Sequence, residues 1–218
     1  MGNFEAQKAE VLTGARWLCE NGYFGGKLGS GGNISLMVRD ADRIVITPSR
    51  TPYQGMQAED ICVIDPERHQ VEGRLPPSIE AGMHIGIYLK RPDVHAVVHT
   101  HQPYASVLSL INRPIPALFD EITVEIGARV EIIPYARSGS EKLVTHVVDR
   151  LGNGCSCYIL QNHGALSLGR DLPEAMRHAE LLEKVSQVYY YALCTGEKIN
   201  RLPETATQHW LKIRNGSD

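Results

Sequence analysis

The sequence predicts a single α/β domain in which a mostly antiparallel central β-sheet is flanked by helices. Three observations support this fold class. Several segments carry apolar residues at helical spacing, and short apolar runs bounded by turn residues lie between them. These two kinds of segment do not follow the strict strand–helix–strand alternation of a parallel sheet. The length of 218 residues, without linker, repeat or low-complexity segment, fits one core, so we assign residues 1–218 to one domain.

The first third of the chain predicts one helix followed by strands. Residues 5–22 have helical spacing and end at Asn21-Gly22, a common helix stop. A glycine-dense loop over residues 25–33 follows. Apolar runs separated by turn residues then predict four strands, at 34–38, 43–47, 61–64 and 69–72.

The rest of the chain predicts further helices and buried strands. Helical spacing, with Ser78, Ser140 and Asp171 as candidate capping residues, predicts helices at 79–90, 102–110, 140–151 and 172–195. Short apolar runs predict strands at 94–99 and 157–161. The polar tail after Gly196 predicts no regular element, and we expect it to be mobile beyond about residue 200.

Charge and composition exclude several classes of partner. The net charge is −3 and no Lys/Arg-rich run is present, so we expect no nucleic-acid partner. No apolar stretch approaches the roughly 20 residues of a membrane span. Because the N-terminal residues also lack the apolar region of a signal peptide, we expect a cytoplasmic protein without a membrane partner. The 5 cysteines form no spaced framework and do not indicate a disulfide scaffold.

Histidines that follow two predicted strands form the first candidate site. His99 and His101 lie at the carboxyl end of an apolar strand, where residues i and i+2 point to the same side. The H-x-H pair alone is also compatible with a polar loop. His163 follows a second apolar strand, and Glu80 lies near a helix start, so all four side chains are candidate ligands of one divalent cation. Three neutral imidazoles and one carboxylate suit Zn²⁺ first, with Mn²⁺ or Co²⁺ as alternatives. His84, one turn after Glu80, either supports these ligands or faces the core.

A glycine cluster predicts an anion pocket near this centre. The small residues of the segment 29–33 allow backbone N–H groups to approach an anion, although such clusters also form ordinary tight turns. The segment is not a dinucleotide-binding fingerprint, because it leads into a strand rather than a helix. Nearby hydroxyl groups and one cation extend the predicted phosphate or carboxylate pocket, which consists of Ser30, Gly31, Asn33, Ser49, Arg50 and Ser78.

Six motifs in a fixed order give the chain a family resemblance. They are GSGGNIS (29–35), ITPSRTPY (46–53), RLPPSIEAGMH (74–84), RPDVHAVVHTH (91–101), INRPIPAL (111–118) and LQNHGAL (160–166). With these motifs, the chain resembles the class II aldolase/adducin family, and within it the L-fuculose-1-phosphate aldolases. The resemblance covers roughly residues 6 to 196.

The resemblance implies the functional residues and the assembly. The metal ligands of the family fall on Glu80, His99, His101 and His163, with one divalent metal ion per subunit. The phosphate pocket of the family falls on Ser30, Asn33, Ser49 and Ser78. The implied fold is a single α/β domain, and the implied assembly is a homotetramer with active sites between subunits.

Two departures from the family pattern bear on the substrate. Asp120, followed by Glu121, stands where the family's aldolases have a catalytic tyrosine. Arg50 and Ile79 stand at positions of the phosphate pocket that are small or carry a hydroxyl group in the family. Arg50 either grips a phosphate or a carboxylate group or faces solvent. The C-terminal tyrosine of the family has no match after Gly196.

The resemblance predicts a lyase that acts on a small phosphorylated sugar. The expected reaction is metal-dependent retro-aldol cleavage of a (deoxy)ketose 1-phosphate to dihydroxyacetone phosphate and an aldehyde, through a metal-stabilised enediolate. Glu80 would move a proton as general base and acid, and Asp120 or Glu121 would protonate or orient the aldehyde end. Two alternatives use the same metal: decarboxylation of a hydroxy-oxo or hydroxylated aromatic acid, and 4-epimerisation of a pentulose phosphate. A non-enzymatic scaffold has no need of four converging ligands.

Overall fold

One β-sheet organises the protein. The computed structural model describes residues 4–25 and 31–216, and within them the sheet has eight strands in the order β4-β3-β2-β1-β5-β8-β7-β6. Neighbouring strands are antiparallel except β6 and β7, which are parallel. The strands are β1 (Asn33–Val38), β2 (Arg43–Ile46), β3 (Cys62–Ile64), β4 (Gln70–Glu72), β5 (Ala96–Thr100), β6 (Glu131–Ile133), β7 (Cys157–Leu160) and β8 (Gly164–Gly169). The predicted fold class is confirmed.

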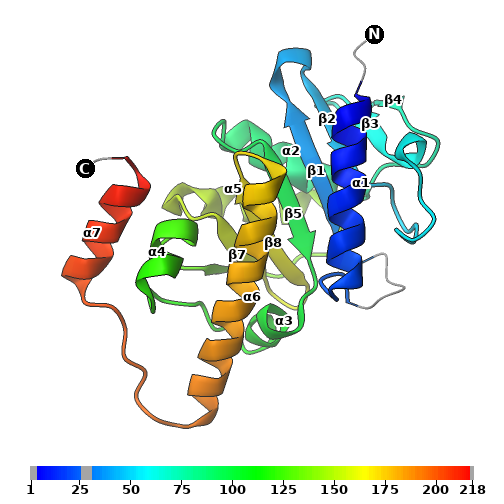
Figure 1. Cartoon of the computed structure of the whole chain (residues 1–218). Helices are drawn as coiled ribbons and strands as arrows, with labels where there is room; N and C mark the ends of the chain where they lie inside the picture. The colour runs from blue at the N-terminus through cyan, green and yellow to red at the C-terminus, as the bar shows by residue number, and fades with distance from the viewer. Residues whose placement is uncertain (1–3, 26–30, 217–218) are drawn as a thin grey trace.

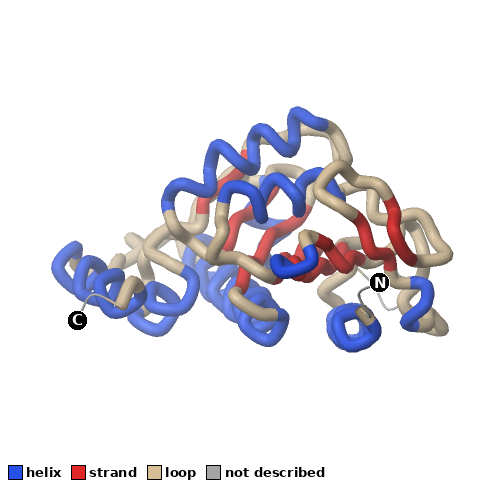
Figure 2. Tube along the Cα trace, turned by 90° about the horizontal axis from the view of Figure 1, so that it is seen from above, coloured by secondary structure: helices blue, strands red, loops and turns tan. Residues whose placement is uncertain are grey.

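Helices cover both faces of the sheet, which gives three layers (Figures 1 and 2). α2 and α5 pack on one face, and α1, α3, α4 and α6 pack on the other, while α7 lies beside α4 at the edge of the molecule. The helices are α1 (Glu5–Glu20), α2 (Ala81–Lys90), α3 (Pro103–Leu110), α4 (Asp120–Ile126), α5 (Glu141–Arg150), α6 (Leu172–Cys194) and α7 (Glu204–Arg214).

Local sequence explains where the helices begin. The Ser140 hydroxyl accepts the backbone N–H of Leu143 at 3.3 Å and so caps α5. The Asp171 carboxylate accepts the N–H of Glu174 at 2.8 Å and caps α6 in the same way. Each such cap contributes about 1 kcal/mol of stability. The capping predictions for Ser140 and Asp171 are confirmed, and α5 then buries the apolar stripe that begins at Leu143 against the sheet. The capping prediction for Ser78 is wrong, because Glu80 occupies the N-cap position of α2 and, among the described residues, no side chain caps that helix.

Strand pairing brings distant segments to one end of the sheet. β5 lies between β1 and β8, with Asn33 opposite His99 on one side and Leu166 opposite His99 on the other. A tight turn over residues 161–163 joins β7 to β8, and its central residue Asn162 has a left-handed φ of 55°. The turn therefore places His163 beside the carboxyl end of β5, with its ring centroid 4.8 Å from that of His99, although α3, α4, β6, α5 and β7 separate the two segments along the chain (Figure 1).

Four elements of the structure are absent from the sequence prediction: α4, β6, β8 and α7. β8 begins and ends with glycine, a residue that is depleted in strands, so its pattern does not indicate one. β6 has only 3 residues and gives no periodicity to detect. α2 begins at Ala81 rather than at residue 79, because Glu80 occupies the N-cap position with φ −96° and ψ 8°.

The segment after Gly196 differs from the prediction of a mobile tail without regular structure. It contains α7, which packs against α4. The guanidinium group of Arg214 donates hydrogen bonds to the carbonyl groups of Val124 and Glu125, and to the hydroxyl of Ser156 at 2.6 Å. The prediction is therefore wrong for residues 204–214. The polar sequence does not indicate this helix, because its C-terminal end is attached by hydrogen bonds from Arg214 rather than by an apolar stripe.

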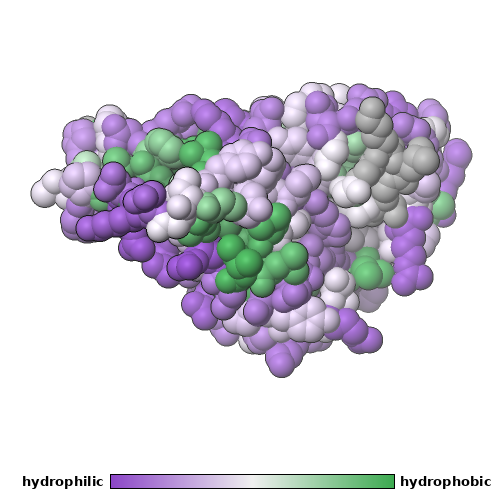
Figure 3. All heavy atoms as spheres, turned by 90° about the horizontal axis from the view of Figure 1, so that it is seen from below, coloured by the Kyte–Doolittle hydropathy of each residue, from purple (hydrophilic) through white to green (hydrophobic). Residues whose placement is uncertain are grey.

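The molecular surface is mostly hydrophilic. Seen from below, it shows apolar groups in separate patches (Figure 3), and the exposed apolar side chains include Leu110 and Ile111 at the end of α3. Across the part of the chain that the structure describes, we find no helix with the length and apolar character needed to cross a membrane.

Candidate metal centre

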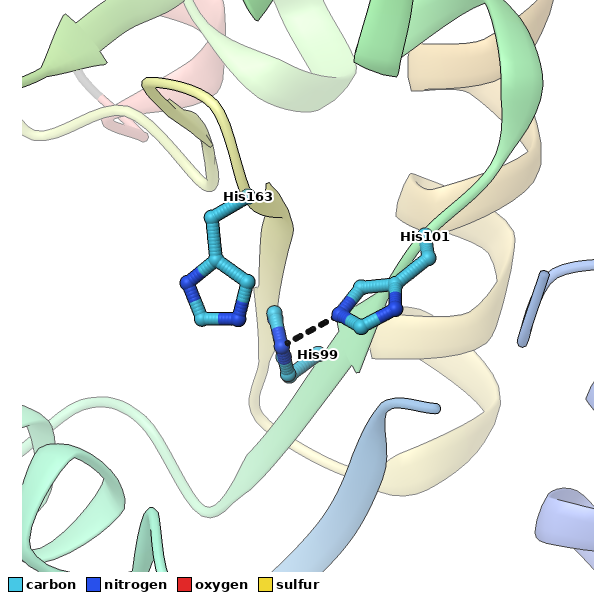
Figure 4. Close-up of side chains that lie close together, drawn as sticks. All are labelled: His99, His101 and His163. Atoms are coloured by element: carbon cyan, nitrogen blue, oxygen red, sulfur yellow. Dashed lines mark hydrogen bonds between the residues drawn. The ribbon is translucent and has the colours of Figure 1, made fainter. Parts of the chain in front are cut away.

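Three imidazoles converge at the carboxyl end of β5 (Figure 4). His99 belongs to β5, His101 follows it, and His163 comes from the turn between β7 and β8. Nε2 of His99 lies 3.1 Å from Nε2 of His101, and one nitrogen from each of the three rings lies within 4.8 Å of the others. The predicted convergence of these three histidines is present in the structure.

Glu80 completes this group from the first turn of α2. Its carboxylate is buried, with Oε2 at 3.2 Å from Nε2 of His99 and Oε1 at 3.4 Å from Nε2 of His163. The backbone holds Glu80 in place because its N–H donates to the Ser78 hydroxyl at 3.2 Å, while the Ser78 N–H donates to the Thr47 carbonyl at 3.1 Å. The four predicted ligands therefore lie together.

The close approach of β8 to β5 depends on Gly164. A Cβ atom at this position would lie 2.3 Å from the Thr100 carbonyl oxygen and 2.6 Å from Cδ2 of His101. Because these distances are far below van der Waals contact, any larger residue would push apart the two segments that carry the histidines. The sequence pattern contains this glycine directly after His163, and the structure supplies its reason.

The hydrogen bonds and burial of these groups fit a divalent cation. Nδ1 of His99 lies 2.9 Å from the Ala165 carbonyl oxygen, so Nδ1 carries the hydrogen and Nε2 presents its lone pair to the centre. Oε1 of Glu80 is buried and has no hydrogen-bond partner within the described residues. A buried carboxylate oxygen without a donor is costly unless a cation is nearby. Three nitrogen donors and one carboxylate match the ligand types of zinc and its first-row neighbours.

The pKa values favour neutral imidazoles at His101 and His163 next to an ionised Glu80, whereas the pKa of His99, which burial lowers, is raised on balance by the charge of Glu80. Burial lowers the pKa of His101 to about 3 and that of His163 to about 4, helped in both cases by the neighbouring His99. Burial opposes ionisation of Glu80, but the charge of His99 and the hydrogen bond with it outweigh burial and hold the pKa of Glu80 well below its usual range. Neutral histidine and ionised glutamate are the forms that coordinate a metal ion.

A cavity of about 170 Å³ opens beside these ligands. Of the predicted anion-binding residues, it is lined by Gly31, Asn33, Ser49, Arg50 and Ser78. Ser30 lies outside the described residues. The sequence did not predict Ser138, which also lines the cavity and has its hydroxyl 3.3 Å from Nε2 of His163. Only its proximity in space identifies Ser138, since it precedes a helix without any motif of its own.

Arg50 provides a positive charge at the mouth of this cavity. Its side chain is exposed and, among the described residues, forms no hydrogen bond or ion pair. Its backbone has a φ of 53°, in the left-handed region that disfavours residues other than glycine. Such strain at a cavity is typical of residues retained for function.

The side chain of Asn33 faces away from solvent. Its Nδ2 donates to Oε2 of Glu80 at 2.9 Å, and its Oδ1 lies 2.5 Å from Nε2 of His84. Both polar ends of the amide are thus engaged inside the protein. The role of Asn33 in phosphate binding stays a prediction.

Asp120 and Glu121 do not line this cavity within one chain. They form the first turn of α4, and Glu121 lies 3.3 Å from the ammonium group of Lys184 on α6. A catalytic role for either residue therefore requires a second subunit.

A larger hollow of about 420 Å³ lies elsewhere, between α4, α6 and α7. Four arginines line it, but three pair with carboxylates and Arg214 is bonded to carbonyl and hydroxyl groups. All four guanidinium groups in this hollow already have hydrogen-bonding partners, so the smaller cavity beside the histidines is the better candidate for chemistry.

Fold and site together define an α/β enzyme scaffold with a possible metal centre of three histidines and one glutamate at one end of an antiparallel sheet. The chain belongs to the class II aldolase and adducin family: the family model described as Class II Aldolase and Adducin N-terminal domain matches residues 9–190. The resemblance identified from the motifs is confirmed.

Individual relatives agree with this assignment. The chain is 33% identical to an L-fuculose phosphate aldolase of Haemophilus influenzae over 180 residues, 83% of this chain and 82% of the relative. It is 31% identical to a 5-deoxy-D-ribulose 1-phosphate aldolase of Bacillus thuringiensis over 188 residues, 86% of this chain and 87% of the relative. A solved structure of an L-fuculose 1-phosphate aldolase superimposes with a TM-score of 0.88 at 30% identity and covers 95% of both chains.

These relatives are aldolases, and aldolases are lyases, so the chain is an enzyme of this class. The class II family is metal-dependent, and the three histidines provide the possible site.

Proposed function

We propose that the protein cleaves a (deoxy)ketose 1-phosphate into dihydroxyacetone phosphate and an aldehyde by a metal-dependent retro-aldol reaction. One observation carries this proposal: a buried carboxylate and three imidazoles lie next to a cavity that contains an unpaired guanidinium group. The names of the relatives, which include aldolases of L-fuculose phosphate and of 5-deoxy-D-ribulose 1-phosphate, support a deoxyketose phosphate.

The metal ligands in this proposal are Glu80, His99, His101 and His163. The cation is Zn²⁺ in the first place, with Mn²⁺ or Co²⁺ as alternatives. When bound, a divalent cation supplies Lewis-acid stabilisation of the negative charge that develops on the substrate oxygens as the C3–C4 bond breaks.

The cavity beside these ligands binds the phosphate group of the substrate. The guanidinium group of Arg50 offers two parallel N–H donors, which match the geometry of a phosphate group. The hydroxyl groups of Ser30, Ser49 and Ser78, and the backbone around Gly31 and Asn33, provide further donors. Holding the phosphate in this cavity fixes the sugar with its carbonyl end toward the histidines.

Glu80 moves a proton at C3 of the substrate. Its Oε2 is engaged by Asn33, whereas Oε1 has no hydrogen-bond partner within the described residues and is free to exchange a proton. In the cleavage direction the carboxyl group of Glu80, after it has taken up a proton from water at Oε1, delivers that proton to C3 of the enediolate, and in the reverse direction the carboxylate removes it. Asp120 or Glu121 of a neighbouring subunit accepts the proton of the C4 hydroxyl group as the aldehyde forms.

A homotetramer with active sites between subunits completes this proposal. The cavity of about 170 Å³ in one chain is smaller than the roughly 300–1,000 Å³ of typical ligand pockets, so a second chain is needed to enclose the substrate. Ile79 is 54% exposed and Phe119 is 45% exposed, which suits apolar contacts with the deoxygenated end of the sugar or with a second subunit. We propose a cytoplasmic location on the basis of the sequence.

Decarboxylation of a hydroxy-oxo or hydroxylated aromatic acid is the second candidate. Arg50 favours it, because a guanidinium group clamps a carboxylate as well as a phosphate.

The test is a substrate panel with enzyme that has been stripped by chelator and reloaded with Zn²⁺, Mn²⁺ or Co²⁺. We expect dihydroxyacetone phosphate to be released from at least one ketose 1-phosphate, with L-fuculose 1-phosphate and 5-deoxyribulose 1-phosphate in the panel. Release should require the added metal. No release from any member, together with CO₂ evolved from oxo acids, would replace the aldolase proposal by the decarboxylase.

A further inference from the structure

A chain of buried polar side chains runs from the core to the candidate metal centre. It begins at Tyr88, whose hydroxyl lies 2.6 Å from the Ser35 hydroxyl. The Ser35 hydroxyl lies 2.6 Å from Nδ1 of His84, and Nε2 of His84 lies 2.5 Å from Oδ1 of Asn33. Nδ2 of Asn33 then reaches Oε2 of Glu80 at 2.9 Å. Ser35 and His84 have no exposed surface, whereas Asn33 and Glu80 are buried residues that line the cavity.

The hydrogen atoms of this chain have only one consistent arrangement. Because Glu80 is a carboxylate and can only accept, Asn33 must turn its NH₂ group toward Glu80 and its oxygen toward His84. Nε2 of His84 must therefore carry a hydrogen, which leaves a lone pair on Nδ1. That lone pair accepts the Ser35 hydroxyl hydrogen, and the Tyr88 hydroxyl hydrogen is shared between the hydroxyl oxygen and the carbonyl oxygen of Ser35. Each group from Tyr88 to Asn33 thus donates a hydrogen to the next group in the direction of Glu80.

This arrangement determines how the Glu80 carboxylate is presented. Oε2 receives the Asn33 amide, whereas Oε1 has no donor within the described residues. If the carboxylate rotated, the buried amide of Asn33 would lose its acceptor. His84 also prevents the Asn33 amide from flipping, because a flipped Asn33 would turn its NH₂ group toward the N–H of His84. His84 thus fixes the side chain of Glu80 through Asn33, without contacting Glu80 itself.

We propose that His84 is a positioning residue that acts through Asn33 to fix the Glu80 carboxylate, with Oε2 held and Oε1 available to the cation and to substrate. The proposal rests on the proposed function, since it assigns Glu80 to the metal centre. It also gives His84 a role beyond filling space in the core, where its side chain is fully buried.

Zn²⁺ affinity, measured by competition with a chromophoric chelator, tests this proposal without reference to turnover. His84→Leu removes the donor to Asn33 and preserves volume. We expect it to weaken Zn²⁺ binding about tenfold or more, the lower end of the usual cost of removing such supporting partners. His84→Gln keeps an N–H donor at the distance of Nε2, and its affinity should stay within about threefold of the original protein, since one such hydrogen bond is retained.

A second buried histidine provides the matched control. His178 of α6 is 3% exposed and is bonded to the Leu168 carbonyl at 2.7 Å, in the larger hollow away from the histidine cluster. Both His178→Leu and His84→Leu should lower thermal stability. Only His178→Leu should leave Zn²⁺ affinity unchanged. If His84→Leu and His84→Gln have the same affinity as the original protein, His84 is a core residue only and the proposal is wrong.

The remaining outcomes also decide between the proposals. Should His84→Leu fail to fold, Asn33→Ala removes the same link with a smaller change in volume. If Asn33→Ala bound Zn²⁺ with the same affinity as the original protein, the positioning role of His84 would be refuted. If the original protein itself does not bind Zn²⁺, Mn²⁺ or Co²⁺, the proposed function fails together with this inference. If it binds and cleaves substrate while the variants bind equally well, only the inference fails.

Discussion

Replacing Arg50 by glycine should move stability and activity in opposite directions. Arg50 adopts φ 53°, a left-handed conformation that costs an L-residue about 1–2 kcal/mol. Glycine adopts this conformation freely but loses about 0.5–1 kcal/mol more backbone entropy on folding. Since the Arg50 side chain forms no hydrogen bond or ion pair with the described residues, nothing else is lost. Arg50→Gly should therefore raise the free energy of unfolding by up to about 1.5 kcal/mol, the largest difference of these two terms.

The same substitution should impair substrate binding. A hydrogen bond to a charged group contributes about 1.5–3 kcal/mol, and about 1.4 kcal/mol corresponds to a factor of ten. Because Arg50 is exposed, we expect the lower part of this range, a loss in kcat/KM of about 10- to 30-fold, mostly through KM.

Urea unfolding curves and initial rates of dihydroxyacetone phosphate release measure the two effects. Arg50→Gln keeps the strained backbone and should lose activity without gaining stability. Arg43→Gln is the control, since within residues 4–25 and 31–216 the Arg43 guanidinium donates only to the neighbouring Asp42 carbonyl on the hairpin of β1 and β2. An Arg50→Gly protein with unchanged KM, or with lower stability, would refute the reasoning.

Other expected outcomes concern the centre, the sheet and the C-terminal helix. Glu80→Gln should lower turnover by roughly 10²–10⁴-fold while the three imidazoles still retain Zn²⁺, as measured by rates and metal content; unchanged turnover would exclude Glu80 as proton carrier. Gly164→Ala should separate β8 from β5 and weaken Zn²⁺ binding at least about tenfold by chelator competition; equal affinity would contradict the close-contact argument. Arg214→Ala should cost about 1–3 kcal/mol in urea unfolding, because carbonyl groups lose their donors; no loss would mean that α7 is held otherwise.

The same group includes the pH dependence of stability. Burial lowers the pKa of His84 from 6.5 to about 3, so this residue stays neutral in the folded protein while the unfolded chain becomes protonated below about pH 6.5. Its contribution is complete above that pH and is lost toward pH 3, at about 1.4 kcal/mol per pH unit. His84→Leu should reduce this slope in metal-free urea titrations; an identical slope would contradict the assignment.

Part of the candidate metal centre could be predicted because short-range rules place it. His99 and His101 are two residues apart on a strand and must point to one side. Glu80 and His163 were candidates from their places at a helix start and after a strand, but only the family motifs grouped them with the H-x-H pair, since nothing in their local sequence says that α2 and the turn before β8 meet β5. The first four strands and the caps of α5 and α6 were predicted for the same reason as the H-x-H pair: their signals lie within a few residues.

Features that depend on distant contacts could not be predicted. Asn33 looked like part of an anion-binding loop, and only the pairing of β1 with β5 turns its amide toward Glu80. α7 has no strong apolar stripe, and its attachment through Arg214 to carbonyl groups leaves no pattern in the sequence. Gly-bounded β8 is a strand because β5 and β7 flank it on both sides, not because its residues favour extended structure.

The turn that carries His163 has a consequence for how the protein matures. Glu80, His99 and His101 leave the ribosome well before His163, and β8 must pair with β5 before the last imidazole reaches the others. A nascent chain that lacks this hairpin offers an incomplete set of donors. Cation loading should therefore follow synthesis of the whole sheet, so truncated or stalled chains would not compete with the finished protein for scarce metal.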